Sequence, residues 1–199
     1  SALEKESVNL SSLRKKFAKK LEEELLKYLH PLGLENIRFQ IVFSRADLTE
    51  KGADAIQFLF SANPGQPLMP LAEIASGGEL SRFLLALKTV FSQVSGSTTL
   101  IFDEIDTGVS GRISSAIAKL LQEISENKQV FCITHQPVVA ASADHHFSVL
   151  KTVDQGVTNA KVLLLEEFRD RQTALAKLAG GNFVEASAYA ASLLDNKAA

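Results

Sequence analysis

The chain has 199 residues, 46% of them hydrophobic, and a formal net charge of −2 at pH 7. That length and apolar content predict a globular protein with a sizeable core, and the near-neutral charge excludes a basic field over the whole chain. A single cysteine, Cys132, excludes an internal disulfide, and no apolar run approaches the roughly 20 residues that span a bilayer. We therefore expect a cytoplasmic protein with no membrane partner. Because the chain starts at Ser1 and its one methionine is Met69, we also expect it to be part of a longer polypeptide.

Residues 10–29 carry the spacing of an amphipathic helix. Apolar side chains recur about every 3.6 residues, at Leu10, Leu13, Phe17, Leu21, Leu25 and Tyr28. The lysine and glutamate runs between them nearly cancel, which favours a solvated surface over a phosphate-binding stripe. His30-Pro31 and Gly33 then predict the end of the helix.

Two segments with alternating apolar residues, 37–43 and 55–60, predict a pair of antiparallel strands. Residues 62–70 hold three of the five prolines and predict a loop. A helix is expected from about Glu79 onward, and its apolar positions are Leu80, Phe83, Leu84, Leu87, Val90, Phe91 and Val94.

The second half of the chain changes character. An apolar run at 100–102, a helical pattern at 113–124 and another apolar run ending at His135 predict strand, helix and strand. This order indicates a parallel sheet buried on both faces. Residues 146–167 predict a hairpin, and the remainder predicts alanine-rich helices around Gly180-Gly181.

Acidic residues directly follow the first of these strands. Asp103 and Glu104 come after Phe102, at the strand end where open α/β sheets bind ligands. In a Walker B arrangement the first carboxylate holds Mg²⁺ and the second orients a water for attack on phosphorus. The pair alone leaves open the alternative that Asp103 or Asp106 caps the following turn.

The second strand ends in Thr134 and His135, so an imidazole is expected at the same sheet edge. A structural histidine at a strand end is the alternative. The segment GVSG at 108–111, together with His135, could suggest a serine hydrolase. However, the nucleophile elbow needs glycine where Arg112 stands.

Two glycines stand at the start of the helix that follows residue 76. Ser76, Gly77, Gly78 and Glu79 match the capping-box pattern, yet each glycine costs roughly 1 kcal/mol relative to alanine inside a helix. Bare backbone at a helix N-terminus lets a phosphate approach its free N–H groups. A flexible loop before a helix is the alternative. The chain contains no G-x-x-x-x-G-K-[ST] phosphate loop, so we do not expect it to cradle ATP phosphates alone.

The segments ASGGELS, TLIFDEIDTG and ITH, in this order, resemble the signature, the Walker B motif with its D-loop, and the switch histidine of an ABC-type ATPase head. Longer phrases between residues 52 and 147 are similar to the SMC-like branch and, within it, to the RecN family of bacterial DNA repair proteins. The resemblance implies an α/β fold, namely the C-terminal lobe of an ABC/SMC-type P-loop ATPase head with a parallel sheet flanked by helices. Residues 1–30 would be an arm helix that ends a coiled coil, and residues 31–199 would be the head lobe with its antiparallel strands.

The resemblance also implies a role for each matching residue. Asp103 would hold Mg²⁺, Glu104 would be the catalytic base, and His135 would sense the γ-phosphate. Asp106 would be the D-loop aspartate at the nucleotide. The signature residues would contact ATP bound to the opposite head, and they are Ser76, Gly77, Gly78 and Glu79.

The implied partners are an N-terminal lobe with the Walker A motif, a second head, and DNA in double-strand break repair at the bacterial nucleoid. ATP hydrolysis would then need the N-terminal lobe, and the isolated chain would be nearly inactive. Two alternatives remain open. The chain could be a non-catalytic interaction module, or half of another ABC ATPase such as a transporter subunit with a membrane partner.

Overall fold

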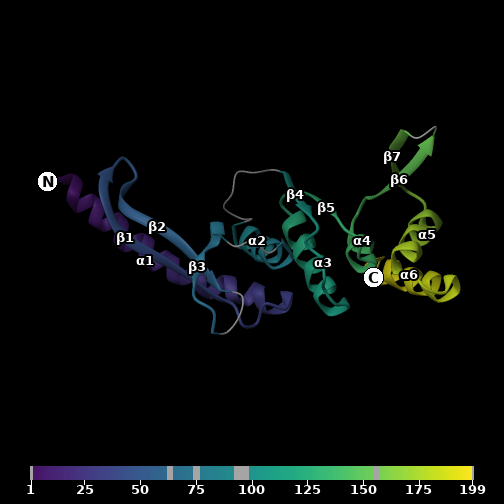
Figure 1. Ribbon diagram of the computed structural model, residues 1–199, viewed down its shortest axis with the longest axis horizontal. Helices are drawn as coiled ribbons and strands as arrows, with labels where there is room; N and C mark the ends of the chain where they lie inside the picture. Colours follow the sequence, from purple (N-terminus) through teal and green to yellow (C-terminus); the bar gives the residue numbers. More distant parts are fainter. Residues whose placement is uncertain (1, 62–64, 74–76, 92–98, 155–156, 199) are drawn as a thin grey trace. The chain divides into compact units, whose positions relative to one another are not determined.

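The structure is a computed structural model that describes residues 2–61, 65–73, 77–91, 99–154 and 157–198. The chain divides into two compact units, Ser1–Ser95 and Gly96–Ala199, which are labelled by element in Figure 1 and described separately. Helix α1 shares the first unit with the strands and helix that follow it. The boundary expected near residue 30 between an arm and a head lobe stays a prediction.

Helix α1, Ala2–Leu29, begins the first unit and confirms the expected amphipathic helix. It ends where the sequence predicts, because Pro31 enters a 3-10 turn, His30–Leu32, and Gly33 adopts a left-handed φ of 72°. The C-terminal part of its apolar face is fully buried at Leu25 and Leu29. Leu13 and Phe17 of the same face are 54% and 60% exposed.

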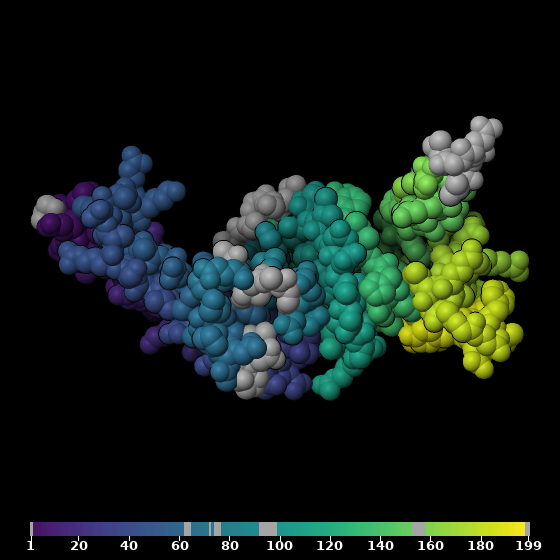
Figure 2. Space-filling model, viewed as in Figure 1, coloured from purple at the N-terminus to yellow at the C-terminus, as the bar shows by residue number. Residues whose placement is uncertain are grey.

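A long hairpin packs along α1. Strands β1, Arg38–Thr49, and β2, Gly52–Ser61, pair antiparallel as expected, and the short strand β3, Met69–Pro70, pairs with β2 before the turn η2, Leu71–Glu73. Figure 2 shows the surfaces of α1 and the hairpin in direct contact, purple against blue. Glu22 fixes this packing in part, since its carboxylate accepts a 2.6 Å hydrogen bond from the Ile41 amide.

Helix α2, Gly77–Phe91, is held to the hairpin by aromatic packing. The ring of Phe83 lies 5.2 Å from that of Phe39 and 5.1 Å from that of Phe60, and Phe83 is fully buried. The helix begins at the two glycines. One detail of the expected apolar face is wrong: Leu84 and Phe91 are about 40% exposed, while Leu85 and Ala86 are buried beside Phe83. The buried face of α2 is therefore rotated by about one residue from the predicted face.

The second unit begins with strand, helix, strand and a short helix. Their bounds are Thr99–Asp103 for β4, Gly111–Ser125 for α3, Gln129–Ile133 for β5 and Pro137–Ser142 for α4. Strands β4 and β5 pair in parallel, as the sequence predicts. Helix α3 contacts β5 and buries Ile117 and Ile124 completely, so its apolar stripe faces inward.

The expectation that this sheet is buried on both faces is wrong for the described chain. Ile101 is 71% exposed, and Phe131 and Ile133 are 45% and 59% exposed. These side chains share one face because strand residues alternate. Phe102 on the opposite face is buried. The described elements therefore leave one apolar face of a parallel sheet open, although such sheets are normally covered on both sides.

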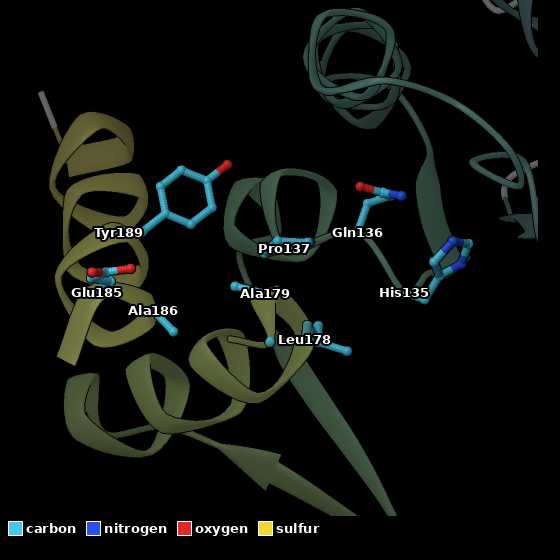
Figure 3. A pocket seen from close by; sticks show the side chains of 9 residues that line it. His135, Gln136, Pro137, Leu178, Ala179, Glu185, Ala186 and Tyr189 are labelled. Atoms are coloured by element: carbon cyan, nitrogen blue, oxygen red, sulfur yellow. The ribbon is translucent and has the colours of Figure 1, made fainter. Parts of the chain in front are cut away.

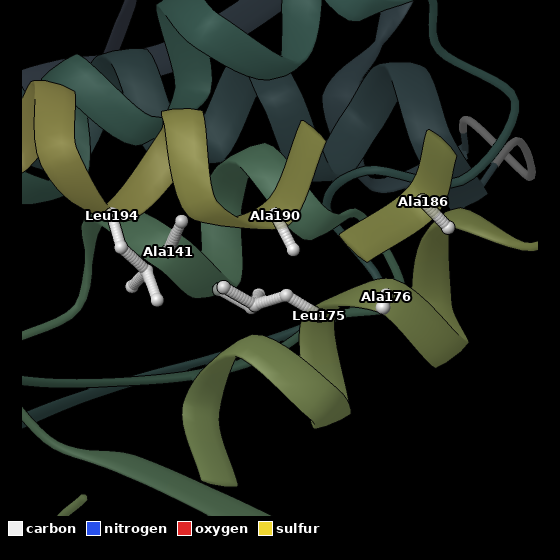
Figure 4. Packing of buried hydrophobic residues seen from close by; sticks show 7 residues of the cluster. Ala141, Leu175, Ala176, Ala186, Ala190 and Leu194 are labelled. Atoms are coloured by element: carbon white, nitrogen blue, oxygen red, sulfur yellow. The ribbon is translucent and has the colours of Figure 1, made fainter. Parts of the chain in front are cut away.

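The rest of the chain forms a hairpin and a helical pair, as expected. Strands β6, His146–Asp154, and β7, Val157–Leu165, pair antiparallel, and helices α5, Phe168–Ala179, and α6, Phe183–Ala198, follow. Small side chains let α4, α5 and α6 approach closely around Leu175, as Figure 4 shows. None of the helices in the described part of the chain combines the length and apolar character of a bilayer-spanning segment.

Candidate functional site at the carboxyl edge of the parallel sheet

The register of the parallel strands places both predicted motifs at one sheet edge. Phe102 pairs with Cys132 and Asp103 with Ile133, so β4 and β5 end at the same level. The amide of Glu104 extends the pairing by donating a 3.4 Å hydrogen bond to the carbonyl of Ile133. The carboxylates at the end of β4 and the imidazole after β5 therefore stand at the same edge of the sheet, as the sequence predicts.

Glu104 has a strained backbone. Its φ is 52°, and among the described residues it is the one non-glycine residue with a positive φ. A left-handed conformation costs an L-residue roughly 1–2 kcal/mol. The turn is closed by the Thr107 amide, which donates to the Glu104 carbonyl at 3.3 Å. Strain of this kind concentrates at functional sites, and here it falls on the predicted catalytic carboxylate.

Asp106 lies inside the protein, with no exposed surface. Its Oδ2 accepts a hydrogen bond from the Thr134 hydroxyl and one of 3.3 Å from the Gln136 amide. That amide also lies 3.0 Å from Thr134 Oγ1. This network ties the turn after β4 to the end of β5, so the alternative in which Asp106 only caps its own turn does not describe the structure. A contact of Asp106 with nucleotide stays a prediction.

His135 stands above this network. Its side chain is 57% exposed, and its Nδ1 lies 3.4 Å from Asp106 Oδ1. That carboxylate oxygen is buried and makes no hydrogen bond within the described residues. His135 therefore combines an accessible ring with a buried carboxylate directly behind it. The sequence patterns do not predict that Thr134 and Gln136 hold Asp106 in place. They place Thr134 at the sheet edge without a role, and no motif marks Gln136, which binds Asp106 through its backbone amide.

The electrostatic character of the edge is negative. Burial, followed by the charges of Asp106 and Asp103, raises the pKa of the Cys132 thiol to about 12. Cys132 is thus a protonated, structural side chain at neutral pH. No group of three or more potential ligands that could hold a metal occurs among the described residues. Mg²⁺ needs only one or two protein carboxylates besides water and phosphate oxygens, so the exposed Asp103 fits such an ion.

The signature residues belong to the other unit, and Ser76 lies outside the described residues. Gly77 and Gly78 form the first turn of α2, with Glu79 next to them. A methyl group added at Gly77 would meet no atom within 4 Å, and φ at Gly77 is not positive. Neither packing nor backbone conformation within the described chain therefore requires glycine at Gly77.

Arg82, on the same helix, is a charged residue that the sequence patterns did not single out. It is only 8% exposed, and its Nε makes no hydrogen bond within the described residues. Burial lowers the pKa of its guanidinium, and the charge of Glu79 partly opposes that effect. The spacing of the sequence could have drawn attention to Arg82, because Glu79 lies three residues before it and residues three apart share a helix face.

A shallow pocket of about 420 Å³ opens beside His135. Figure 3 shows Gln136 and Pro137 leading from the end of β5 into α4, with Glu185 and Tyr189 presented by α6. Leu178 and Ala179 of α5 complete the wall. His135 thus also lines this pocket.

Comparison with known proteins first identifies the protein family and the fold. Residues 10–141 match the family described as "AAA domain, putative AbiEii toxin, Type IV TA system". The fold is that of an SMC head: the chain superimposes with a TM-score of 0.57 on an Smc head domain with a coiled coil and joint from Pyrococcus yayanosii. That match has 21% identity and covers 84% of this chain and 29% of the other. The chain belongs to this AAA-domain family.

The curated proteins with similar sequences point to a narrower group. The chain is 45% identical to the DNA repair protein RecN of Synechocystis sp. over 96% of its length, and 41% identical to RecN of Halalkalibacterium halodurans over 97%. It is 44% identical to RecN of Bacillus subtilis over 79%. The chain is thus RecN-like, as its motifs suggest. It covers 35%, 35% and 30% of these three relatives, so it spans about a third of their length.

Proposed function

We propose that the chain is the C-terminal lobe of a RecN-like ATPase head that acts in bacterial DNA double-strand break repair. The observation that carries this proposal is that Asp103, Glu104 and His135 stand at the same end of the two paired parallel strands. Open α/β sheets bind their ligands at this edge. The lobe would act in the cytoplasm at the nucleoid, as part of a protein that engages DNA.

Each residue at the edge has a distinct task in this proposal. Asp103 would hold Mg²⁺, and bound Mg²⁺–ATP would supply the phosphorus under attack and the metal charge that neutralises its oxygens. Glu104 would orient the attacking water and accept its proton. His135 would face the γ-phosphate with its exposed ring. Ser76, Gly77, Gly78 and Glu79 would contact nucleotide bound to a second head, since Gly77 leaves its backbone open.

The open face of the parallel sheet supports a missing lobe. The chain has no Walker A motif, and it spans about a third of the length of its relatives. The exposed side chains of Ile101, Phe131 and Ile133 offer an apolar face that a parallel sheet normally covers. We propose that the N-terminal lobe, with the Walker A motif, packs on this face and that the isolated chain hydrolyses ATP slowly or not at all.

Helix α1 would pair with a second helix as the end of a coiled coil. Leu3, Leu10 and Phe17 are spaced by seven residues and are 64%, 36% and 60% exposed. Leu13, three residues after Leu10, is 54% exposed. Positions a and d of a heptad repeat have this spacing, which supports pairing along this stripe. Helix α1 ends at Leu29, and other residues of the helix contact β1 and β2 of the hairpin.

The test joins the chain to a Walker A-bearing lobe and compares ATP hydrolysis by the joined and isolated chains. We expect turnover only in the joined protein, and Glu104→Gln should lower its kcat by roughly 10²–10⁴-fold, the usual contribution of a general base. Glu166→Gln, an exposed carboxylate outside the edge, is the matched control and should keep full activity. Full activity in the joined Glu104→Gln protein contradicts the catalytic role.

A non-catalytic docking module is the second candidate, and the open sheet face is the observation in its favour. The two proposals differ in how two heads associate. Association that needs nucleotide and is lost in Ser76→Arg supports the ATPase. Association that is indifferent to nucleotide and to that substitution supports the module.

A further inference from the structure

Behind His135 lies a buried carboxylate oxygen that lacks a donor. Asp106 has no exposed surface, and both hydrogen bonds given for its carboxylate go to Oδ2, from the Thr134 hydroxyl and the Gln136 amide. Oδ1 makes no hydrogen bond within the described residues. A buried, unsatisfied carboxylate oxygen is costly, and native structures rarely leave one without a partner.

The imidazole of His135 can supply a donor to this oxygen. Its Nδ1 lies 3.4 Å from Asp106 Oδ1, which is within ion-pair range but longer than a typical hydrogen bond. The His135 side chain is 57% exposed, so its ring has room to rotate by the small amount that closes this gap. Such contacts are often long in ligand-free enzymes and shorten when the substrate binds.

We propose that Asp106 is a positioning residue that keeps the proton of neutral His135 on Nδ1 and turns Nε2 outward. An ionised carboxylate can only accept hydrogen bonds, so the nitrogen that faces it must carry a proton. Any further proton that His135 takes up then resides on Nε2, where the ring can donate it to an anionic group at the sheet edge. The inference rests on the proposed function for the identity of that group, but not for the geometry.

Thr134 and Gln136 give the carboxylate its orientation. Because their two donors hold Oδ2, Oδ1 is left to face His135. The same argument predicts the effect of replacing the Asp106 carboxylate with an amide. In Asp106→Asn the amide oxygen would keep the Thr134 and Gln136 hydrogen bonds, and the NH₂ group would point toward Nδ1. Nδ1 must then accept, so the proton of His135 moves to Nε2. A carboxylate–imidazole pair elsewhere loses the correct tautomer in the same way when the carboxylate becomes an amide.

The test is ¹⁵N NMR of the four histidine rings of this chain at about pH 8.5, about two units above the ordinary imidazole pKa. The signals of His135 are assigned by their loss in His135→Gln. We expect mainly the Nδ1–H tautomer in the unaltered chain and mainly the Nε2–H tautomer in Asp106→Asn. Thr134→Val leaves the carboxylate in place and should keep Nδ1–H. The control His145→Gln, at an exposed position, should leave the His135 signals unchanged.

A predominant Nε2–H tautomer in the unaltered chain overturns the inference, and this measurement does not depend on any variant folding. An unchanged tautomer in folded Asp106→Asn overturns it too. The readout needs no nucleotide and no ATP hydrolysis, so it is separate from the test of the proposed function. The expected tautomers together with an inactive joined protein would support the positioning role and refute the ATPase proposal.

Discussion

Arg14 of α1 lies 3.0 Å from Asp54 of β2, measured from Nη1 to Oδ2, and the two residues are 40 positions apart in the chain. Ser11 donates a second hydrogen bond to Asp54, of 2.7 Å, and Arg14 also donates to the Lys51 carbonyl at 2.8 Å. The side chain of Asp54 is 9% exposed. This contact fastens the exposed, N-terminal half of α1 to the tip of the hairpin.

Asp54→Asn should lower the melting temperature of the protein near neutral pH. The hydrogen bonds from Ser11 and Arg14 lower the pKa of Asp54 from 3.8. A carboxyl group whose pKa is lower in the folded state stabilises it above the unfolded pKa, and this contribution is lost as the pH falls through the folded value. Thermal unfolding should therefore separate the two proteins at pH 7, with the gap closing below about pH 4. Asp47→Asn, at an exposed position of β1, is the control.

The strain at Glu104 predicts that glycine is tolerated better than alanine at this position. Glu104→Gly and Glu104→Ala both lack the carboxylate, but only glycine adopts a φ of 52° without steric cost. We expect Glu104→Gly to be more stable than Glu104→Ala by about 1 kcal/mol, measured by chemical denaturation. Both should abolish ATP hydrolysis in the joined protein. Equal stability of the two variants would show that the left-handed conformation carries no strain.

Gly77→Ala separates folding from nucleotide recognition. The added methyl group has open space around it, and alanine is the better helix former by up to about 1 kcal/mol. The variant should therefore fold with equal or higher stability. In the joined protein we expect ATP-dependent association of heads to weaken by about tenfold or more, equivalent to about 1.4 kcal/mol, measured by analytical ultracentrifugation. Undiminished association would mean that Gly77 has no role at the nucleotide.

His146 should make the second unit less stable in mild acid. It is 9% exposed, its Nδ1 has no hydrogen bond within the described residues, and burial followed by the nearby charge of Arg171 lowers its pKa from 6.5. The unfolded chain therefore binds a proton that the folded chain resists, and stability falls as the pH drops below about 6.5.

Chemical denaturation at pH 7.5 and pH 5.5 measures this effect. His146→Gln should lose part of the difference in unfolding free energy between the two pH values. His145→Gln, at the exposed neighbouring position, should retain that difference. The same loss in both variants would rule out His146 as the source.

Much of the fold could be predicted because it depends on local patterns. The alternation at residues 37–43 and 55–60, the end of α1 at Pro31 and Gly33, and the strand–helix–strand order around α3 each rest on neighbours in the chain. Which residues of α2 are buried could not be predicted as precisely from the sequence. Phe83 faces two rings from a hairpin 20 or more residues away, and their packing turns Leu84 outward.

The sequence by itself determined which groups stand at the two strand ends, because the order Phe102, Asp103, Glu104 and the order Thr134, His135 are covalent facts. It also determined that the edge would be shared, since parallel strands end together. Only the tertiary structure decided that Asp106 turns inward to Thr134 and Gln136, and that its other carboxylate oxygen, beside His135, has no hydrogen bond within the described residues. It alone also showed Ile101 and Ile133 on an open face. Burial and hydrogen bonding depend on groups that are distant in the chain, and local sequence patterns do not show which distant groups come together.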